Sequence, residues 1–284
     1  MLHWKKNSDK PEIVPEDLQS PINPKIILLI LGSVVCFEIF NSIEPKDSSK
    51  FTFFDFSYLI SFGVAAVFGI FISKRYWGSK IFGKSYLSLS LGYASYFIGS
   101  LVWYIYAVIY HVENPYPYYP DIAYFAFFPF VIYHLKRNIQ FFKPRLEKKQ
   151  KFNLIIIPIG ITLLFTFVTL VPMDITSGVF NLKFLPAPDH DQTFYTTTAT
   201  SIAYVILDAS ILSGTLVGFK IFRNSSLGSA WGLLLVGLAL YTLADLIYYY
   251  FEAFGLDVAN NVQGLWVGSA IVACYALYKH KSFL

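Results

Sequence analysis

Long apolar runs alternate with short polar links along almost the entire chain. A helix needs about 20 mostly apolar residues to cross the hydrocarbon core of a bilayer, and eight stretches reach or nearly reach that length. The predicted membrane-spanning helices cover residues 26–43, 53–73, 87–110, 122–142, 152–171, 194–219, 230–254 and 262–278. The pattern therefore predicts an all-α fold, a polytopic membrane bundle of eight transmembrane helices.

The fourth stretch has the shortest uncharged core. That core ends at Leu135, is followed by Lys136 and Arg137, and contains Pro129. Long cationic side chains can extend to the membrane interface while their helix stays in the bilayer. A span at this place is also needed if the charged links are to alternate sides along the chain.

Positive charge is concentrated in every second link. The links rich in lysine and arginine are residues 73–85, 135–152, 219–230 and the C-terminal tail. The other links hold only three lysines among a larger number of acids. Links rich in lysine and arginine stay on the cytoplasmic side of a membrane. The pattern thus predicts a multi-pass protein of the cell membrane with both termini in the cytoplasm.

The composition agrees with lipid as the solvent. Mean hydropathy is +0.52 and 14% of the 284 residues are charged, against about 25% in soluble domains. No small-residue cleavage site closes the first apolar run, which indicates a retained span rather than a signal peptide. We expect a cytoplasmic segment, residues 1–24, and a transmembrane domain, residues 25–281. Cys36 and Cys274 lie in apolar stretches, so no disulfide is predicted.

The sequence also contains a candidate internal repeat. A shift of 145 positions lays the third and fourth stretches on the seventh and eighth without a gap, and Gly92 then coincides with Gly237. This favours two parallel four-helix halves, residues 25–142 and 152–281, related by an axis along the membrane normal. The alternative is a chance alignment between two apolar, aromatic-rich sequences.

Two glycine pairs mark candidate helix contacts. Gly214 and Gly218, and likewise Gly264 and Gly268, are spaced four residues apart. Lipid gives no hydrophobic drive between helices, so small residues that let backbones approach are favoured at their contacts. The alternative is the general abundance of glycine in membrane helices.

Three acids stand out inside predicted spans: Glu38, Asp208 and Asp245. Ionisable groups are costly within a membrane, so each is a candidate for function. At about 1.5 Å per residue, Asp208 lies roughly 20 Å below the outer end of its helix and Asp245 roughly 22 Å above the inner end of its own. We therefore expect no direct contact between them. The functional interpretation is a polar pocket or proton path, and the structural one is a protonated acid bonded to a tyrosine or a backbone carbonyl.

Polar side chains lie about one helical turn from both Asp208 and Asp245. Tyr204 lies one turn before Asp208, and Tyr248 and Glu252 share a helix face with Asp245. These side chains are the expected partners of the two acids under either interpretation.

The link formed by residues 111–121 contains three prolines, which stiffen an extended backbone. Asp121 follows Pro120 in the first turn of a predicted helix, where the helix dipole favours an anion. Capping is by itself a sufficient explanation of Asp121. The functional alternative is an aromatic-lined outer mouth to which Trp103 and Tyr124 contribute.

Several chemistries lack their motifs. The chain has no P-loop, no GxSxG and no HExxH sequence, and no lysine in the middle of a span that could hold retinal. The run from Asp189 to Asp191 has no second histidine at ligand spacing. The sequence therefore predicts no cofactor, no metal and no nucleic-acid partner, and favours a role other than catalysis.

Several segments resemble the motifs of one known membrane module. Residues 115–129, PYPYYPDIAYFAFFP, resemble its PxPSxADxxYLxxYP segment, and the run from Tyr204 to Asp208 resembles its YPxxD segment. Residues 231–248 are similar to its WxLLxxG…ADxxY helix, and Trp266 falls where its last helix carries tryptophan. The module is an eight-helix sensor that precedes diguanylate cyclase (GGDEF), EAL or kinase domains in bacterial signalling proteins.

The resemblance covers residues 86–278 and has departures. Tyr118, Pro120 and Val205 stand where the module carries serine, alanine and proline. No output domain follows the last predicted helix, so the resemblance implies signalling through a separate protein or a homo-oligomer. It further implies a sensory or ligand-binding membrane module whose ligand is a small molecule or a lipid.

Other functions stay open. Parallel halves and carboxylates inside the membrane also fit a secondary transporter, although the paired glycine or proline interruptions of broken helices are missing. A membrane enzyme acting on lipid is a further alternative, for which no activated nucleophile is evident. The candidate site residues under all hypotheses are Glu38, Trp103, Asp121, Tyr124, Tyr204, Asp208, Asp245, Tyr248, Glu252 and Trp266.

Overall fold

The described part of the chain is almost entirely helical. The computed structural model describes residues 24–43, 53–79, 81–110, 118–143, 145–170, 192–225, 228–252 and 259–282. The α-helices in them are α1 (Pro24–Ile43), α2 (Phe53–Arg75), α3 (Phe82–Tyr104), α4 (Tyr119–Phe142), α5 (Lys148–Leu170), α6 (Gln192–Phe222), α7 (Gly228–Glu252) and α8 (Ala259–Ser282). A π-helical segment, η2 (Ile105–Ile109), continues α3. The all-α prediction is confirmed for these residues.

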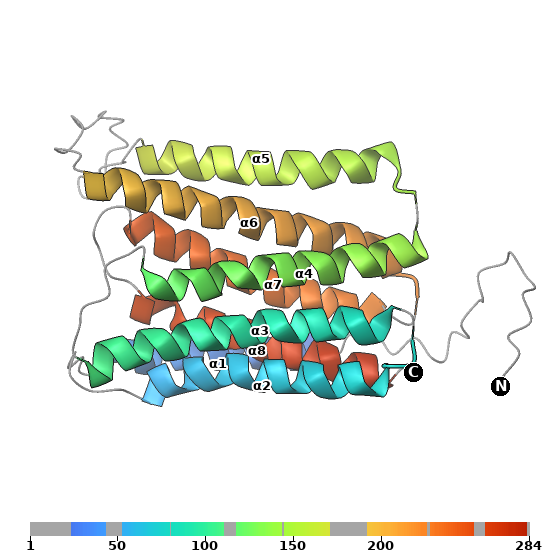
Figure 1. Ribbon diagram of the computed structural model, residues 1–284, viewed down its shortest axis with the longest axis horizontal. Coiled ribbons are helices and arrows are strands. Elements are labelled where there is room, and N and C mark those ends of the chain that lie inside the picture. Colours follow the sequence, from blue (N-terminus) through green and yellow to red (C-terminus); the bar gives the residue numbers. More distant parts are fainter. Residues whose placement is uncertain are drawn as a thin grey trace, which may run out of the picture.

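The helices lie side by side with their axes aligned (Figure 1). Consecutive helices that pack together run antiparallel, because the beginning of one meets the end of the next, as where Ser73 of α2 donates to the backbone oxygen of Gly83 in α3. Each predicted stretch corresponds to one helix. The largest differences are at α3, which begins before residue 87, and at α8, which is longer than the predicted stretch at both ends.

Six helices are long and apolar enough to cross a membrane: α1, α2, α3 with η2, α5, α6 and α7. Within the described residues α4 and α8 fall short by composition, although we had predicted both as spans. α8 is largely enclosed by α7, α2 and α1, and α4 packs one face between α3 and α6. Polar side chains there meet other helices rather than lipid, so the pair needs less apolar surface. The chain is a helical bundle typical of a multi-pass membrane protein.

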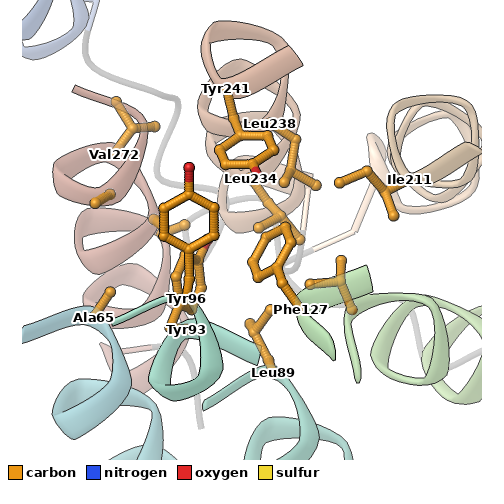
Figure 2. Packing of buried hydrophobic residues seen from close by; sticks show 14 of the residues in the cluster. Ala65, Leu89, Tyr93, Tyr96, Phe127, Ile211, Leu234, Leu238, Tyr241 and Val272 are labelled. Atoms are coloured by element: carbon orange, nitrogen blue, oxygen red, sulfur yellow. The ribbon is translucent and has the colours of Figure 1, made fainter. Parts of the chain in front are cut away.

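Aromatic side chains fill the centre of the bundle (Figure 2). The rings of Tyr96, Phe127 and Tyr241 lie together between α3, α4 and α7, with centroids 5.2 to 5.8 Å apart. Phe62 of α2 stacks on Tyr96 at 4.2 Å. Rings at such distances contribute about 0.5 to 1.5 kcal/mol per pair beyond the area they bury. The core therefore joins both ends of the sequence through α2, α3, α4 and α7.

Both predicted glycine pairs lie at helix contacts. A side chain at Gly218 would overlap the ring of Trp231 in α7, and one at Gly268 would overlap Val34 in α1. A Cβ at Gly214 would lie 3.2 Å from Leu135 of α4. The absence of a side chain thus lets α6 approach α7 and α4, and lets α8 approach α1, as the spacing predicted.

Positive charge gathers at one end of the bundle, the basic end, where α1, α3, α5 and α7 begin and α2, α4, α6 and α8 end. Every lysine and arginine of the described residues lies there: Lys25, Lys74, Arg75, Lys84, Lys136, Arg137, Lys143, Arg145, Lys148, Lys149, Lys151, Lys220, Arg223, Lys279 and Lys281. We call the opposite end the far end. The described acids other than Glu147 lie in the middle of the bundle or toward this far end.

Candidate functional site

Asp121 joins two helices at the far end. It lies in the first turn of α4, where its Oδ2 accepts a hydrogen bond from the backbone N–H of Tyr118 at 2.6 Å and forms part of a capping box. Its Oδ1 accepts a second bond, 2.6 Å long, from the hydroxyl of Tyr204 in α6. Asp121 therefore caps its own helix, as predicted, and also ties α4 to α6.

Tyr204 is held by stacking as well as by this bond. It is 1% exposed, and its ring lies 4.1 Å from Phe125 of α4 and 4.7 Å from Tyr249 of α7. One turn further along α6, Asp208 is fully buried. Tyr204 and Asp208 are four residues apart and therefore lie on the same face of α6. On this face Tyr204 meets α4, and Asp208 faces α7.

Asp208 and Asp245 form a buried carboxyl pair between α6 and α7. They are 0% and 1% exposed, and their carboxyl groups are close enough to interact electrostatically. The structure thus brings the two residues nearer to each other than their predicted depths implied. We use the name carboxyl pair for Asp208 and Asp245 below.

The two carboxyl groups lie at similar depths because α6 extends beyond the bilayer. With 31 residues, α6 is about 46 Å long, well beyond the hydrocarbon core, so its outer end does not mark the membrane surface. Measured from the basic end, Asp208 lies 14 residues before Phe222 and Asp245 lies 17 residues after Gly228. These separations correspond to about 21 and 25 Å, which puts the two carboxyls at similar levels.

The carboxyl pair has few donors. Trp266 of α8 donates its indole N–H to Oδ1 of Asp245 at 2.5 Å, and the hydroxyl of Tyr241 lies within hydrogen-bonding range of the same carboxyl group. Both oxygens of Asp208 and Oδ2 of Asp245 have no donor in the described part of the chain. Two ionised carboxylates are both acceptors. The contact between them becomes a hydrogen bond only when one of them carries a proton.

A series of hydroxyl groups leads away from the carboxyl pair. The ring of Tyr241 lies 5.6 Å from the ring of Tyr96, and Tyr58 of α2 donates to the Tyr96 hydroxyl at 3.1 Å. Tyr58 is also within range of Ser100 and Tyr124, and the Tyr124 hydroxyl lies 3.4 Å from Ser100 Oγ. We call these side chains, Tyr241, Tyr96, Tyr58, Tyr124 and Ser100, the hydroxyl chain. It ends one turn from Asp121, at the far end.

Three further predicted residues lie near this site. Tyr248 packs its ring on Trp266 at a centroid distance of 5.6 Å. Glu252 is half-buried at the end of α7. Glu38 of α1 accepts a bond from the backbone N–H of Gly264 at 2.5 Å, which the missing side chain of that glycine permits. Glu38 therefore belongs to the contact between α1 and α8.

Other predictions do not contribute to the buried site. Trp103 is 44% exposed on α3 and is not part of the buried cluster. The run from Asp189 to Asp191 and most of the proline-rich link lie outside the described residues. Within the described residues, no group of three or more histidine, cysteine, aspartate or glutamate side chains is placed to hold a metal ion.

The sequence interpretation missed a second polar cluster near the basic end. Ser85 Oγ of α3 and His134 Nδ1 of α4 are 2.9 Å apart. The Asn138 side chain donates to Ser85 Oγ at 2.6 Å and to the backbone oxygen of His134 at 2.8 Å. We call these residues the histidine cluster. The spacing of His134 and Asn138, one helical turn, was the available signal, because it puts both on one face of α4.

No protein-family model, no curated protein and no solved structure matches the chain. Its class therefore follows from the bundle itself and from the polar groups inside it. The chain is an all-helical protein of the multi-pass membrane type, with a buried carboxyl pair, a hydroxyl chain and a separate histidine cluster.

Proposed function

We propose that this protein is a membrane sensor module of eight transmembrane helices that signals through a separate partner protein or a second copy of itself. The observation that carries the proposal is the linkage of helices by the aspartates of its three motifs. Asp121 joins α4 to α6 through Tyr204, and Asp208 meets Asp245 between α6 and α7. Buried polar contacts between helices are few and directional, so they favour discrete arrangements of the bundle.

The sensor acts by a shift between two such arrangements. A small molecule, a lipid or a physical state of the bilayer changes the population only if it interacts differently with each. The far end, where Asp121 and Tyr204 meet, receives the stimulus. The basic end, at the opposite termini of α4, α6 and α7, contacts the partner.

The orientation of the bundle is part of the proposal. We place the basic end, and with it both termini, in the cytoplasm because of the positive-inside rule. A cysteine at Lys148, the first residue of α5, tests this in a variant whose Cys36 and Cys274 are replaced by serine. A reagent that cannot permeate intact cells is expected to leave this cysteine unmodified and to label it after lysis. Labelling in intact cells would reverse the orientation.

Spin labels at the basic end test the sensor role. Cysteines introduced at Lys136 of α4 and Lys220 of α6, both exposed, report the separation of the two helices. We expect a distance distribution with two components in liposomes. Their proportions should change when Asp121→Ala or Asp208→Ala removes a contact between helices.

Glu147→Gln is the matched control. Glu147 lies outside the helices and pairs only with Lys143 on the surface. Its removal should leave the distribution unchanged. A single component that is the same in the wild type and in every variant would exclude a two-state sensor.

A secondary transporter is the second candidate, because the contacts within the two proposed halves correspond. Gly92 packs on Phe127 and Gly237 packs on Val272, and both residues of the first contact shift by 145 positions to give the second. In the proposed repeat, α2 and α4 of the first half correspond to α6 and α8 of the second. The contact of α2 with α8 then has its counterpart in the contact of α6 with α4. Parallel halves related by an axis along the membrane normal would have this pattern.

Reconstitution separates the two candidates. A transporter in proteoliposomes is expected to move a solute or protons when a pH gradient is imposed, and Asp245→Asn should abolish this flux. A sensor shows the spin-label response described above without flux. Flux that is equal in empty and protein-containing liposomes would exclude transport of protons.

A further inference from the structure

The carboxyl pair has an unmet requirement for positive charge. Asp208 and Asp245 face each other in the interior, and three of their four oxygens have no donor in the described part of the chain. Two adjacent carboxylates cannot both be ionised in an apolar interior without a cation or a proton between them. The group that belongs between these oxygens is therefore positively charged.

The protein itself supplies no such charge in the described residues. All described lysines and arginines lie at the basic end, and His134 sits beside Trp231, 14 residues from Asp245 along α7. The titratable side chains that interact with the carboxyl pair are tyrosines from three helices: Tyr58 of α2, Tyr96 of α3 and Tyr241 of α7. Their hydroxyls donate and accept hydrogen bonds but carry no positive charge.

The chemistry of the site points to a proton as the ligand. Both oxygens of Asp208 and one of Asp245 have no donor in the described part of the chain, and the two carboxyl groups interact with each other. A single shared proton removes one of two adjacent negative charges and lets one carboxyl group donate to the other.

We propose that the carboxyl pair binds a proton reversibly and that the hydroxyl chain delivers it from the far end. This deepens the proposed function, on which it rests for its purpose, by naming H⁺ as the sensed or transported species. On binding, one carboxylate becomes a carboxylic acid that donates to the other, and the charge of the pair changes from minus two to minus one. On release, the proton leaves and the two anions repel each other.

The hydroxyl chain can carry the proton without any net change of its own. The Tyr241 hydroxyl gives its proton to Asp245 and receives another from Tyr96, and the same exchange continues through Tyr58 toward Tyr124 and Ser100. Each hydroxyl ends with the number of protons it began with. The last member, Tyr124, is one turn from Asp121 on α4, at the far end, where it takes up the replacement proton from a hydronium ion of the outside solvent.

Infrared spectroscopy of the purified full-length protein in lipid nanodiscs tests the site without a partner or a further ligand. A buried carboxylic acid gives a C=O stretching band that shifts when the sample is transferred to D₂O. We expect this band in the wild type at neutral pH, its loss as the pH is raised, and its absence from the double variant Asp208→Asn/Asp245→Asn.

Asp55→Asn is the control for the site. Asp55 is an acid at the far end that accepts a bond from Gln263 at 2.7 Å and is not part of the carboxyl pair. Its variant should retain the band. The proposal is overturned if the wild type has no such band at any pH, or if the band persists in the double variant.

The path is tested by the rate of exchange with D₂O. Tyr96→Phe interrupts the hydroxyl chain and should slow the shift of the band by about tenfold, the effect of losing one hydrogen bond. Tyr93→Phe is the matched control, since Tyr93 is a buried tyrosine one turn earlier on α3 and is not part of the chain. Equal rates in the two variants overturn the path. If the infrared band is present but the spin-label test gives a single unchanging component, the sensor function is refuted and the proton-binding site is retained.

Discussion

The histidine cluster and the carboxyl pair are both buried polar groups, but only one of them is internally complete. In the histidine cluster, Ser85, His134 and Asn138 bond to one another and to the backbone at 2.6 to 3.3 Å. In the carboxyl pair, three of the four oxygens have no donor within the described residues. A buried polar network that satisfies its members stabilises one arrangement of helices.

The difference separates a structural role from a functional one. Asn138 and Ser85 are neutral, so joining α3 to α4 through them requires no added ligand. Asp208 and Asp245 require an added proton, and that requirement makes the contact between α6 and α7 depend on conditions. Sites at which a protein tolerates an incomplete network are frequently the sites of function.

The largest expected effect on stability comes from breaking the complete network. Asn138→Leu removes the donor to Ser85 and to the backbone of His134 and leaves buried acceptors unpaired. We expect a loss of about 2 kcal/mol in the free energy of unfolding, measured by detergent titration of the purified protein. Gln140→Leu, at an exposed position of the same helix, should have no such effect. Equal stability of the two variants would show that the histidine cluster is not structural.

A smaller effect is expected where a single bond is lost. Tyr204→Phe keeps the stacking on Phe125 and Tyr249 but removes the hydroxyl that donates to Asp121. The loss should be about 1 kcal/mol. In a double-mutant cycle with Asp121→Asn, the two losses should not add, because both remove the same bond. Tyr133→Phe, on the exposed side of α4, serves as the control.

At the carboxyl pair the conservative substitution should have little effect on stability at low pH. Asp208→Asn replaces an acid by an amide that can donate to Asp245 without a bound proton. We expect the unfolding free energy to stay within about 1 kcal/mol of the wild type. At high pH, where the wild-type pair loses its proton, the variant should become the more stable protein. A wild-type stability that does not fall relative to the variant as the pH rises contradicts this expectation.

The smallest effect is expected at the surface, with the opposite dependence on pH. The hydrogen bond from Lys143 holds the pKa of Glu147 below its usual value. A lowered pKa contributes stability above the pKa of the unfolded chain, and this contribution is lost as the pH falls. Because the pair is exposed to solvent, Glu147→Gln should leave acid unfolding within the error of a detergent titration.

The helices were predictable from sequence because lipid imposes long apolar runs. The polar content of α4 and α8 shows the limit of that argument, since helices that pack against protein need not meet the composition of lipid-facing ones. The contacts at Gly218 and Gly268 were predictable because small residues at this spacing have one main use in membrane helices.

The sequence indicated which residues belong to the candidate site but not which side chains they contact. Glu38, Asp208 and Asp245 were identified because ionisable groups are rare in apolar helices, and Asp121 because it follows Pro120 at the start of a helix. That Tyr204 reaches Asp121 across 83 positions depends on how α4 and α6 pack, which no local pattern encodes. The meeting of Asp208 with Asp245 depended on the length of α6, and the histidine cluster was overlooked because histidine near a helix end is unremarkable by composition.

The level of the carboxyl pair also makes it an electrical element. Asp245 lies seven residues from the end of α7 at Glu252, which is about 10 Å inside the bundle. A proton that enters from outside and stops at this level has crossed part of the transmembrane voltage, which is worth about 2.3 kcal/mol per elementary charge for every 100 mV across the full membrane. A negative interior would therefore draw the proton in, and occupancy of the proposed site would follow the membrane potential as well as the external acidity.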